Sequence, residues 1–219
     1  MTNDLSTSGI AASGLDLSEV FMFFFLMLGP FKILGPFAKM TKDIDDASRN
    51  ALATRAVIFS ALALALATLI GESSLTNYGV SLNVLAIAGG LVLFLVSIRT
   101  ILAQFDSPEI EETVRQPFSP TWAVSPLAFP TIVTPYGIAA VIIFAAVAPD
   151  FMTKAQVVLL AMCVLVLDLV AMLFVRPLLK WFGMPLALLG VILAIIQLAI
   201  GLQVIFRALN RMGVMKLQS

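Results

Sequence analysis

The sequence predicts an all-α membrane protein with six transmembrane helices, and three observations lead to this class. Of the 219 residues, 60% are hydrophobic and only 12% are charged, about half of the ~25% that is usual in soluble domains. The mean hydropathy is +1.05. The apolar residues also gather in six stretches, each about as long as the ~20 residues that a helix needs to cross a bilayer. A soluble globule has too little polar surface to cover so much apolar material.

The six stretches define the expected order of elements. Backbone groups inside hydrocarbon have no water partners, so each stretch must be a helix. The expected spans are residues 17–40, 51–70, 80–103, 121–148, 154–175 and 185–206. They form two three-helix halves (17–103 and 121–206), joined by a polar connecting loop (104–120) and flanked by a polar N-terminal segment (1–16) and a C-terminal tail (207–219).

The composition excludes several classes of function. The chain has no histidine, so histidine-dependent catalysis and His-ligated metals are absent, and Cys163 as the only cysteine excludes an internal disulfide. Lys and Arg balance Asp and Glu at 13 each, so no basic excess supports nucleic-acid binding. We therefore expect no enzyme, no catalytic residue, no metal and no cofactor. The lipid bilayer is the expected partner.

The distribution of Lys and Arg predicts the orientation. If the N-terminus lies on the non-cytoplasmic side, the cytoplasmic links hold eight of these residues and the outside segments hold four, with Lys32 set aside within the first span. Both termini are therefore expected on the non-cytoplasmic side, although the basic C-terminal tail argues the other way.

Because three spans is an odd number, two similar halves would lie upside down relative to each other, which is the inverted-repeat architecture of many secondary transporters. The first span of each half carries helix-breaking residues. The first has two Gly-Pro pairs, in LGPFKILGPF (28–37), and the fourth has three prolines, in SPLAFPTIVTPYG (125–137). We predict that helices 1 and 4 are discontinuous, since each proline removes a backbone donor.

Paired breaks predict a central binding site. Freed carbonyls suit an ammonium group or a cation, and half-helix N-termini suit a carboxylate, so the breaks would form a solvated, uncharged site for a small zwitterion. The alternative is that both breaks are ordinary proline kinks. The candidate substrate-binding residues are Gly29, Pro30, Gly35, Pro130, Thr131, Thr134 and Pro135.

Two ionisable residues lie within the spans, where such groups are expensive to insert. Asp168 is near mid-depth of the fifth span and is a candidate proton- or cation-coupling carboxylate. The alternative is a buried ion pair with Lys32, which lies between the two Gly-Pro pairs, unless Lys32 extends towards the cytoplasmic side.

Other side chains suit local roles. Thr131, Thr134 and Tyr136 flank the second break and can bond its freed carbonyls or contact a ligand directly. Gln197 and Gln203 are six residues apart, on nearly opposite helix faces, so they cannot line one cavity together. Small residues such as Ala86 and Gly90 predict close helix packing. The phenylalanines at 21 and 23–25 are expected to face lipid.

The pattern resembles the MarC-related integral membrane proteins over roughly residues 17–206. The resemblance is carried by LGPFKILGPF (28–37), IGE (70–72), YGVSL (78–82), AIAGGLVLFLVSIRTIL (86–102), SPLAFPTIVTPYGI (125–138) and GVILAIIQLAIG (190–201). It implies an inner-membrane protein with two inverted three-helix halves. It also implies a carrier like those relatives that transport small neutral amino acids with protons or cations.

The chain departs from the family pattern at several polar positions. Gly29 replaces the usual Asn before the first proline, and Lys32 stands at a usual glycine position. The displaced second proline is Pro36, alanines replace two usual arginines, at Ala86 and Ala187, and Thr134 and Tyr136 replace two usual glycines.

The preferred function is a secondary transporter of small neutral solutes such as amino acids. The loss of family motif residues and the cationic Lys32 motivate the alternative, a non-transporting structural or accessory subunit of a membrane complex. A homo-oligomer or a membrane-complex partner is compatible with either.

Overall fold

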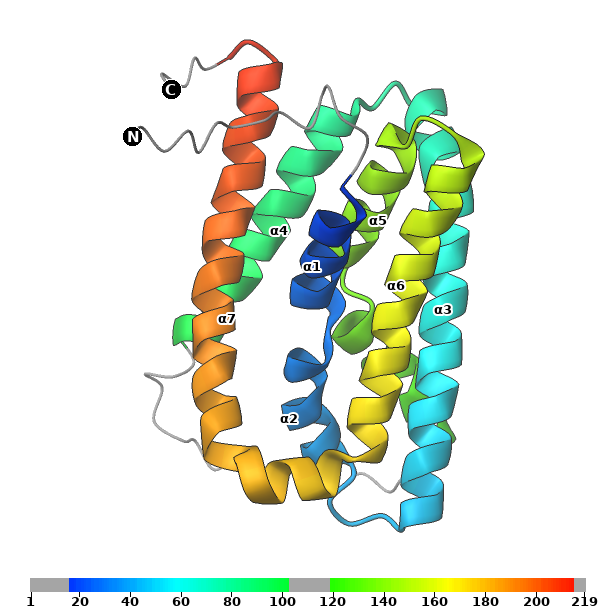
Figure 1. Cartoon of the computed structure of the whole chain (residues 1–219), viewed down its shortest axis with the longest axis vertical. Coiled ribbons are helices and arrows are strands. Elements are labelled where there is room, and N and C mark those ends of the chain that lie inside the picture. The colour runs from blue at the N-terminus through cyan, green and yellow to red at the C-terminus, as the bar shows by residue number, and fades with distance from the viewer. Residues whose placement is uncertain (1–15, 103–118, 215–219) are drawn as a thin grey trace, which may run out of the picture.

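The computed structural model describes residues 16–102 and 119–214, without the side chains of residues 72, 76, 120, 179 and 181–189. All regular elements in these two ranges are helices, and no strand occurs in them (Figure 1). The helices are α1 (Leu17–Leu28), α2 (Pro30–Met40), α3 (Asp46–Asn77), α4 (Leu82–Leu102), η1 (Pro120–Ala123), η2 (Val124–Ile132), α5 (Pro135–Val147), α6 (Phe151–Leu173) and α7 (Val175–Arg211).

Five of the helical stretches are long and apolar enough to cross a membrane, and a sixth span results if one bent pair is counted together. The bent pair joins Thr121–Ile132 to Pro135–Val147 at an angle of 64°. The five are Leu17–Met40 (α1 with α2), Asp46–Leu75, Leu82–Leu102, Phe151–Leu173 and Gly190–Arg211. This confirms the prediction of an all-helical membrane protein, whereas the inverted relation of the two halves stays a prediction. The connecting loop expected at 104–120 lies almost wholly outside the described residues.

The outer surface of the bundle is apolar, as contact with lipid requires. On α3, the side chains of Leu62, Leu66 and Leu69 are more than half exposed, and on α6 Leu159 is 67% exposed. Contiguous exposed apolar surface on this scale is unusual for a soluble monomer. The buried polar side chains of the described residues therefore stand out: Thr41, Arg49, Ser60, Ser97, Thr134, Asp168 and Gln197.

Helices α4 and α7 run side by side and approach closely at two glycines (Figure 1). A Cβ atom on Gly90 would lie 2.9 Å from the carbonyl oxygen of Gly201, and a Cβ on Gly201 would lie 2.9 Å from that of Gly90. The two backbones are thus in direct contact. The close packing predicted for the small residues of this span is confirmed at Gly90.

Helices α1 and α2 lie among the other helices and supply much of the core. Phe24 is fully buried, and its ring meets Phe144 of α5 edge to face with 5.5 Å between centroids. Phe21, Phe23 and Phe25 are partly buried against the same core. The expectation that these phenylalanines face lipid is therefore wrong for Phe24 and incomplete for the other three.

Charged side chains connect helices at one end of the bundle. The first turns of α7 lie across this end before the helix turns to run along α4 (Figure 1). Arg176, near the start of α7, donates to the Asp46 carboxylate and, at 3.1 Å, to the carbonyl oxygen of Ile44. Asp46 also accepts from the buried Arg49 at 2.6 Å. These contacts connect the α6–α7 junction to the start of α3.

Candidate functional site

The first break is a single residue wide. Gly29 ends α1 and precedes α2 with extended torsions (φ −69°, ψ 173°), and Pro30 is the first residue of α2. A Cβ atom at Gly29 would lie 2.0 Å from the carbonyl oxygen of Phe25, so a larger residue requires the backbone to shift. The second Gly-Pro pair does not break the span, because α2 continues through Gly35 and Pro36 to Met40.

A side chain of α7 and one of α2 bond the carbonyls that the first break frees. In a continuous helix the carbonyl of Leu26 would accept from residue 30, but proline has no N–H. The Gln197 amide of α7 donates to this oxygen at 2.5 Å. The next carbonyl, that of Met27, accepts from the Lys32 ammonium at 2.6 Å.

The second break has a different construction. Val133 and Thr134 separate η2 from α5, and Pro135 is the first residue of α5. Within η2, Ser125 and Phe129 have extended torsions, as expected for residues that precede a proline. The approach to this break is thus irregular backbone, whereas the approach to the first is regular α-helix.

The polar groups of the second break bond locally. The Thr131 hydroxyl donates to the carbonyl oxygen of Pro126 at 2.8 Å, so the predicted bond to a freed carbonyl is found for this residue. Thr134 instead caps α5, with its hydroxyl oxygen accepting from the N–H of Gly137 at 3.2 Å. Among the described residues, the Tyr136 hydroxyl has Lys32 as its hydrogen-bond partner and not a carbonyl.

The two breaks meet near mid-height of the bundle (Figure 1). The Lys32 ammonium of α2 donates to the Tyr136 hydroxyl of α5 at 2.7 Å and lies 4.8 Å from the centroid of the Tyr136 ring. Leu28, the last residue of α1, packs on Gly137, where an added Cβ would lie 2.5 Å from the Leu28 side chain. The structure therefore brings the Gly29–Pro30 and Thr134–Pro135 pairs into one region.

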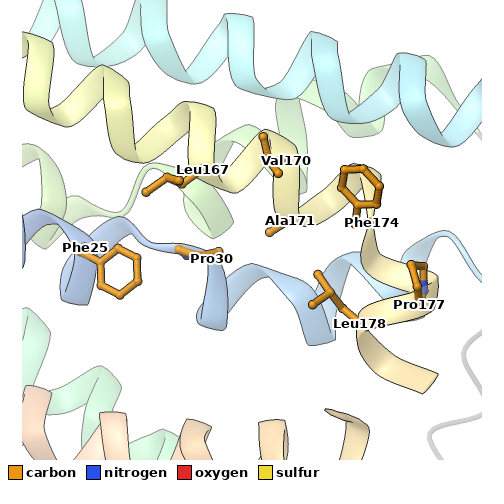
Figure 2. Close-up of a pocket in the computed structure, with 8 residues that line it drawn as sticks. All are labelled: Phe25, Pro30, Leu167, Val170, Ala171, Phe174, Pro177 and Leu178. Atoms are coloured by element: carbon orange, nitrogen blue, oxygen red, sulfur yellow. The ribbon is translucent and has the colours of Figure 1, made fainter. Parts of the chain in front are cut away.

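Asp168 is buried without a partner. Its side chain is 0% exposed, and neither carboxylate oxygen has a hydrogen-bond partner among the described residues. Leu167 and Ala171, which flank it on α6, line the same groove as Pro30, so Asp168 lies at the depth of the first break (Figure 2). The ion pair considered between Asp168 and Lys32 does not form, because the Lys32 ammonium bonds Met27 and Tyr136 instead.

Hollows adjoin the breaks in the described part of the chain. One, of about 30 Å³, lies beside Met27 and Tyr136 and is otherwise lined by apolar and glycine residues. The other is a groove of about 520 Å³ with an apolar lining (Figure 2). Its lining residues are Phe25, Pro30, Leu167, Val170, Ala171, Phe174, Pro177 and Leu178.

Neither hollow is a solvated site for a small zwitterion, and the site expected at the breaks stays a prediction. The hollow beside Tyr136 has room for about one water molecule, and the groove beside Pro30 offers hydrocarbon rather than polar groups. Among the predicted site residues, Gly35 lies within α2 away from the break, and an added Cβ there would meet open space beyond its own helix backbone.

Sequence reasoning missed Gln197 as a site residue. Its burial at 7% exposure and its bond to Leu26 make it part of the first break, whereas Gln203 is exposed. The prediction that these two glutamines do not share a cavity is confirmed. The signal that could have found Gln197 is the one that singled out Asp168, namely a polar side chain inside an apolar span.

Comparison with known proteins identifies the family. The family model described as "MarC family integral membrane protein" matches residues 16–213. A UPF0056 membrane protein of Archaeoglobus fulgidus is 29% identical over 84% of this chain and 88% of its own length. One of Methanocaldococcus jannaschii is 27% identical over 85% and 92%, respectively. No solved structure matches the chain. The family match spans nearly all the described helices and both breaks, and the chain thus belongs to the MarC family of integral membrane proteins.

Proposed function

We propose that the chain is a secondary transporter of small neutral solutes such as amino acids, coupled to a proton or cation at Asp168. The observation that carries the proposal is the Asp168 carboxylate, fully buried and without a hydrogen-bond partner among the described residues. A buried charge without a partner is strongly unfavourable, so this group must bind a proton or a cation to remain where it is. The need to bind a proton or a cation is a property of a site that couples transport to an ion gradient.

The two breaks support the rest of the proposal. The N-terminus of α2 has no side-chain cap, because the N-cap residue Gly29 has no side chain. The N–H groups of this helix end therefore suit a carboxylate. This N-terminus lies at the depth of Asp168, whose negative charge suits an ammonium group or a proton. A small zwitterion thus has a complementary group for each end.

A solute can enter only after the halves separate. The breaks are in contact, and the hollow beside Tyr136 has room for about one water molecule. In the proposed cycle this is a closed arrangement, and the Lys32–Tyr136 hydrogen bond opens when either side becomes accessible. We further propose an inner-membrane location with both termini on the non-cytoplasmic side, which reporter fusions at the C-terminus would test.

Uptake into proteoliposomes tests the function. Labelled alanine is supplied with and without an imposed proton gradient. We expect gradient-dependent uptake by the wild-type protein, loss of the gradient dependence in Asp168→Asn, and normal uptake by Asp150→Asn, a surface control. Uptake by Asp168→Asn that responds to the gradient as the wild type does would contradict the assignment of Asp168.

A second candidate function is that of a non-transporting subunit of a membrane complex. It is favoured by the hydrogen bonds that Lys32 and Gln197 make at the breaks, together with the small hollow beside Tyr136. Gentle purification would then yield a stoichiometric partner, and the proteoliposomes would transport no solute.

A further inference from the structure

The Lys32 ammonium has the surroundings of a bound monovalent cation. Its nitrogen lies 2.6 Å from the Met27 carbonyl oxygen, 2.7 Å from the Tyr136 hydroxyl and 4.8 Å from the centre of the Tyr136 ring. A main-chain carbonyl at a helix break is the kind of oxygen that binds Na⁺ in transporters with broken helices. A hydroxyl oxygen and an aromatic face are further partners that attract cations.

The charged and titratable groups around this position are few. Tyr136 comes from α5, and Asp168 of α6 lies at the depth of the first break. Helix α7 contributes the uncharged Gln197 amide at the neighbouring carbonyl, and η2 has no charged side chain. A metal ion placed here would meet the ammonium, and the repulsion between two positive charges is strong at such depth.

We propose that Lys32 is a tethered cation that occupies the crossing of the two breaks and excludes monovalent metal ions from it. Removing the ammonium then leaves a carbonyl oxygen, a hydroxyl oxygen and a nearby carboxylate, and this set binds Na⁺ or K⁺. The inference rests on the proposed function in one respect only: if the chain is a coupled transporter, its coupling ion is the proton and not a metal ion.

Cation-dependent thermal unfolding tests the proposal on the full chain in detergent. Tm is measured in NaCl, KCl and choline chloride at equal ionic strength, for the wild type, Lys32→Met and Lys39→Met. Lys39 is an exposed lysine of the same helix and provides the matched control. We expect the Tm of the wild type and of Lys39→Met to be the same in all three salts.

Lys32→Met should show a saturable rise in Tm with Na⁺ or K⁺ over choline, of about 3 °C or more at saturation, as expected for ligand binding to a chain of this size. The double variant Lys32→Met/Asp168→Asn should lose most of this rise. A saturable Na⁺ or K⁺ effect on the wild type, or no effect on Lys32→Met, would overturn the proposal.

A folding defect in Lys32→Met is itself informative. If the variant cannot be purified in choline chloride, the proposal predicts that NaCl or KCl restores the yield of folded protein, and the same holds for Lys32→Gln. Failure of both variants in all three salts would overturn it. None of these measurements needs a solute or a flux, so a failed uptake assay and a failed cation assay remain distinguishable.

Discussion

The two breaks differ in where the hydrogen-bond partners of their free backbone groups come from. At the first break, the carbonyl of Leu26 depends on Gln197, which is 171 residues away in the chain, and that of Met27 depends on Lys32. At the second break, Thr131 bonds a carbonyl five residues before it and Thr134 caps its own helix. The first break therefore combines a long-range bond from α7 with a local bond from Lys32, whereas the bonds of Thr131 and Thr134 at the second break are all local. A movement of α7 would disturb the first break and leave the second intact.

The largest expected effect comes from Gly29, where the first break has no room for a side chain. Gly29→Ala places a Cβ atom 2.0 Å from the Phe25 carbonyl oxygen, and the backbone shift needed to relieve this should destabilise the protein by about 3 kcal/mol or more. Gly35→Ala is the matched control, since an added Cβ there meets open space beyond its own helix backbone, and the variant should be neutral or mildly stabilising. Thermal unfolding in detergent measures both. Equal stability of the two variants would refute the claim that the first break has no room for a side chain.

Gln197→Leu should weaken the long-range support of the first break. The change removes the donor to the Leu26 carbonyl and leaves a partly buried acceptor without this partner, at a cost of about 1–2 kcal/mol. Gln203→Leu on the same helix alters an exposed side chain and should have little effect. Comparing the free energies of unfolding of the two variants checks this, and a larger loss at Gln203 would be inconsistent with the geometry.

Thr131→Val should have a smaller effect, because it removes one local hydrogen bond at the second break. We expect a loss of about 0.5–1 kcal/mol. In the matched control Thr68→Val, the hydroxyl donates to the Leu64 carbonyl within an uninterrupted helix, where the backbone N–H already bonds that oxygen. The control should therefore be neutral. If Thr68→Val loses as much stability as Thr131→Val, the Thr131 hydroxyl stabilises the second break no more than a hydroxyl stabilises a regular helix.

The smallest expected effect is on the stability of the protein in acid. The uncharged cap residues of the breaks, Gly29 and Thr134, should not influence it. Outside the spans, the Thr153 backbone N–H and hydroxyl hold the pKa of Asp150 below its usual value. A pKa that is lower in the folded than in the unfolded chain contributes stability above the unfolded value of about 3.9. That stability is lost as the pH falls through the lower, folded value. Asp150→Asn should reduce this loss below pH ~4, whereas Thr134→Asn should leave it unchanged. Unfolding curves across this pH range distinguish the two.

The sequence predicts the membrane helices and the positions of the helix-breaking prolines. Length and hydropathy predicted the membrane helices, because a span needs a fixed number of apolar residues. Proline chemistry drew attention to Gly29–Pro30 and to the three prolines of residues 125–137, since a missing N–H is visible in the sequence. The pair Gly35–Pro36 has the same signature, yet α2 continues through it, because a membrane helix can accommodate a proline when its surroundings support it.

Other features depend on the folded structure. The burial of Phe24 could not be predicted, because a helix that meets both lipid and core carries no amphipathic signal. The partners of Leu26 and Lys32 could not be predicted either, since they are 171 and 104 residues away in the chain. The small volume between the breaks depends on these same side chains and has no signature in the sequence.

A double-mutant cycle between Lys32 and Tyr136 tests the central claim most directly, namely that the two breaks meet and are joined by one hydrogen bond. The free energy of unfolding is measured in choline chloride for Lys32→Met, Tyr136→Phe and the double variant. The observed bond of 2.7 Å predicts a coupling energy of about 1 kcal/mol or more. Strictly additive effects of the two substitutions would show that the breaks are not joined there and would contradict the account.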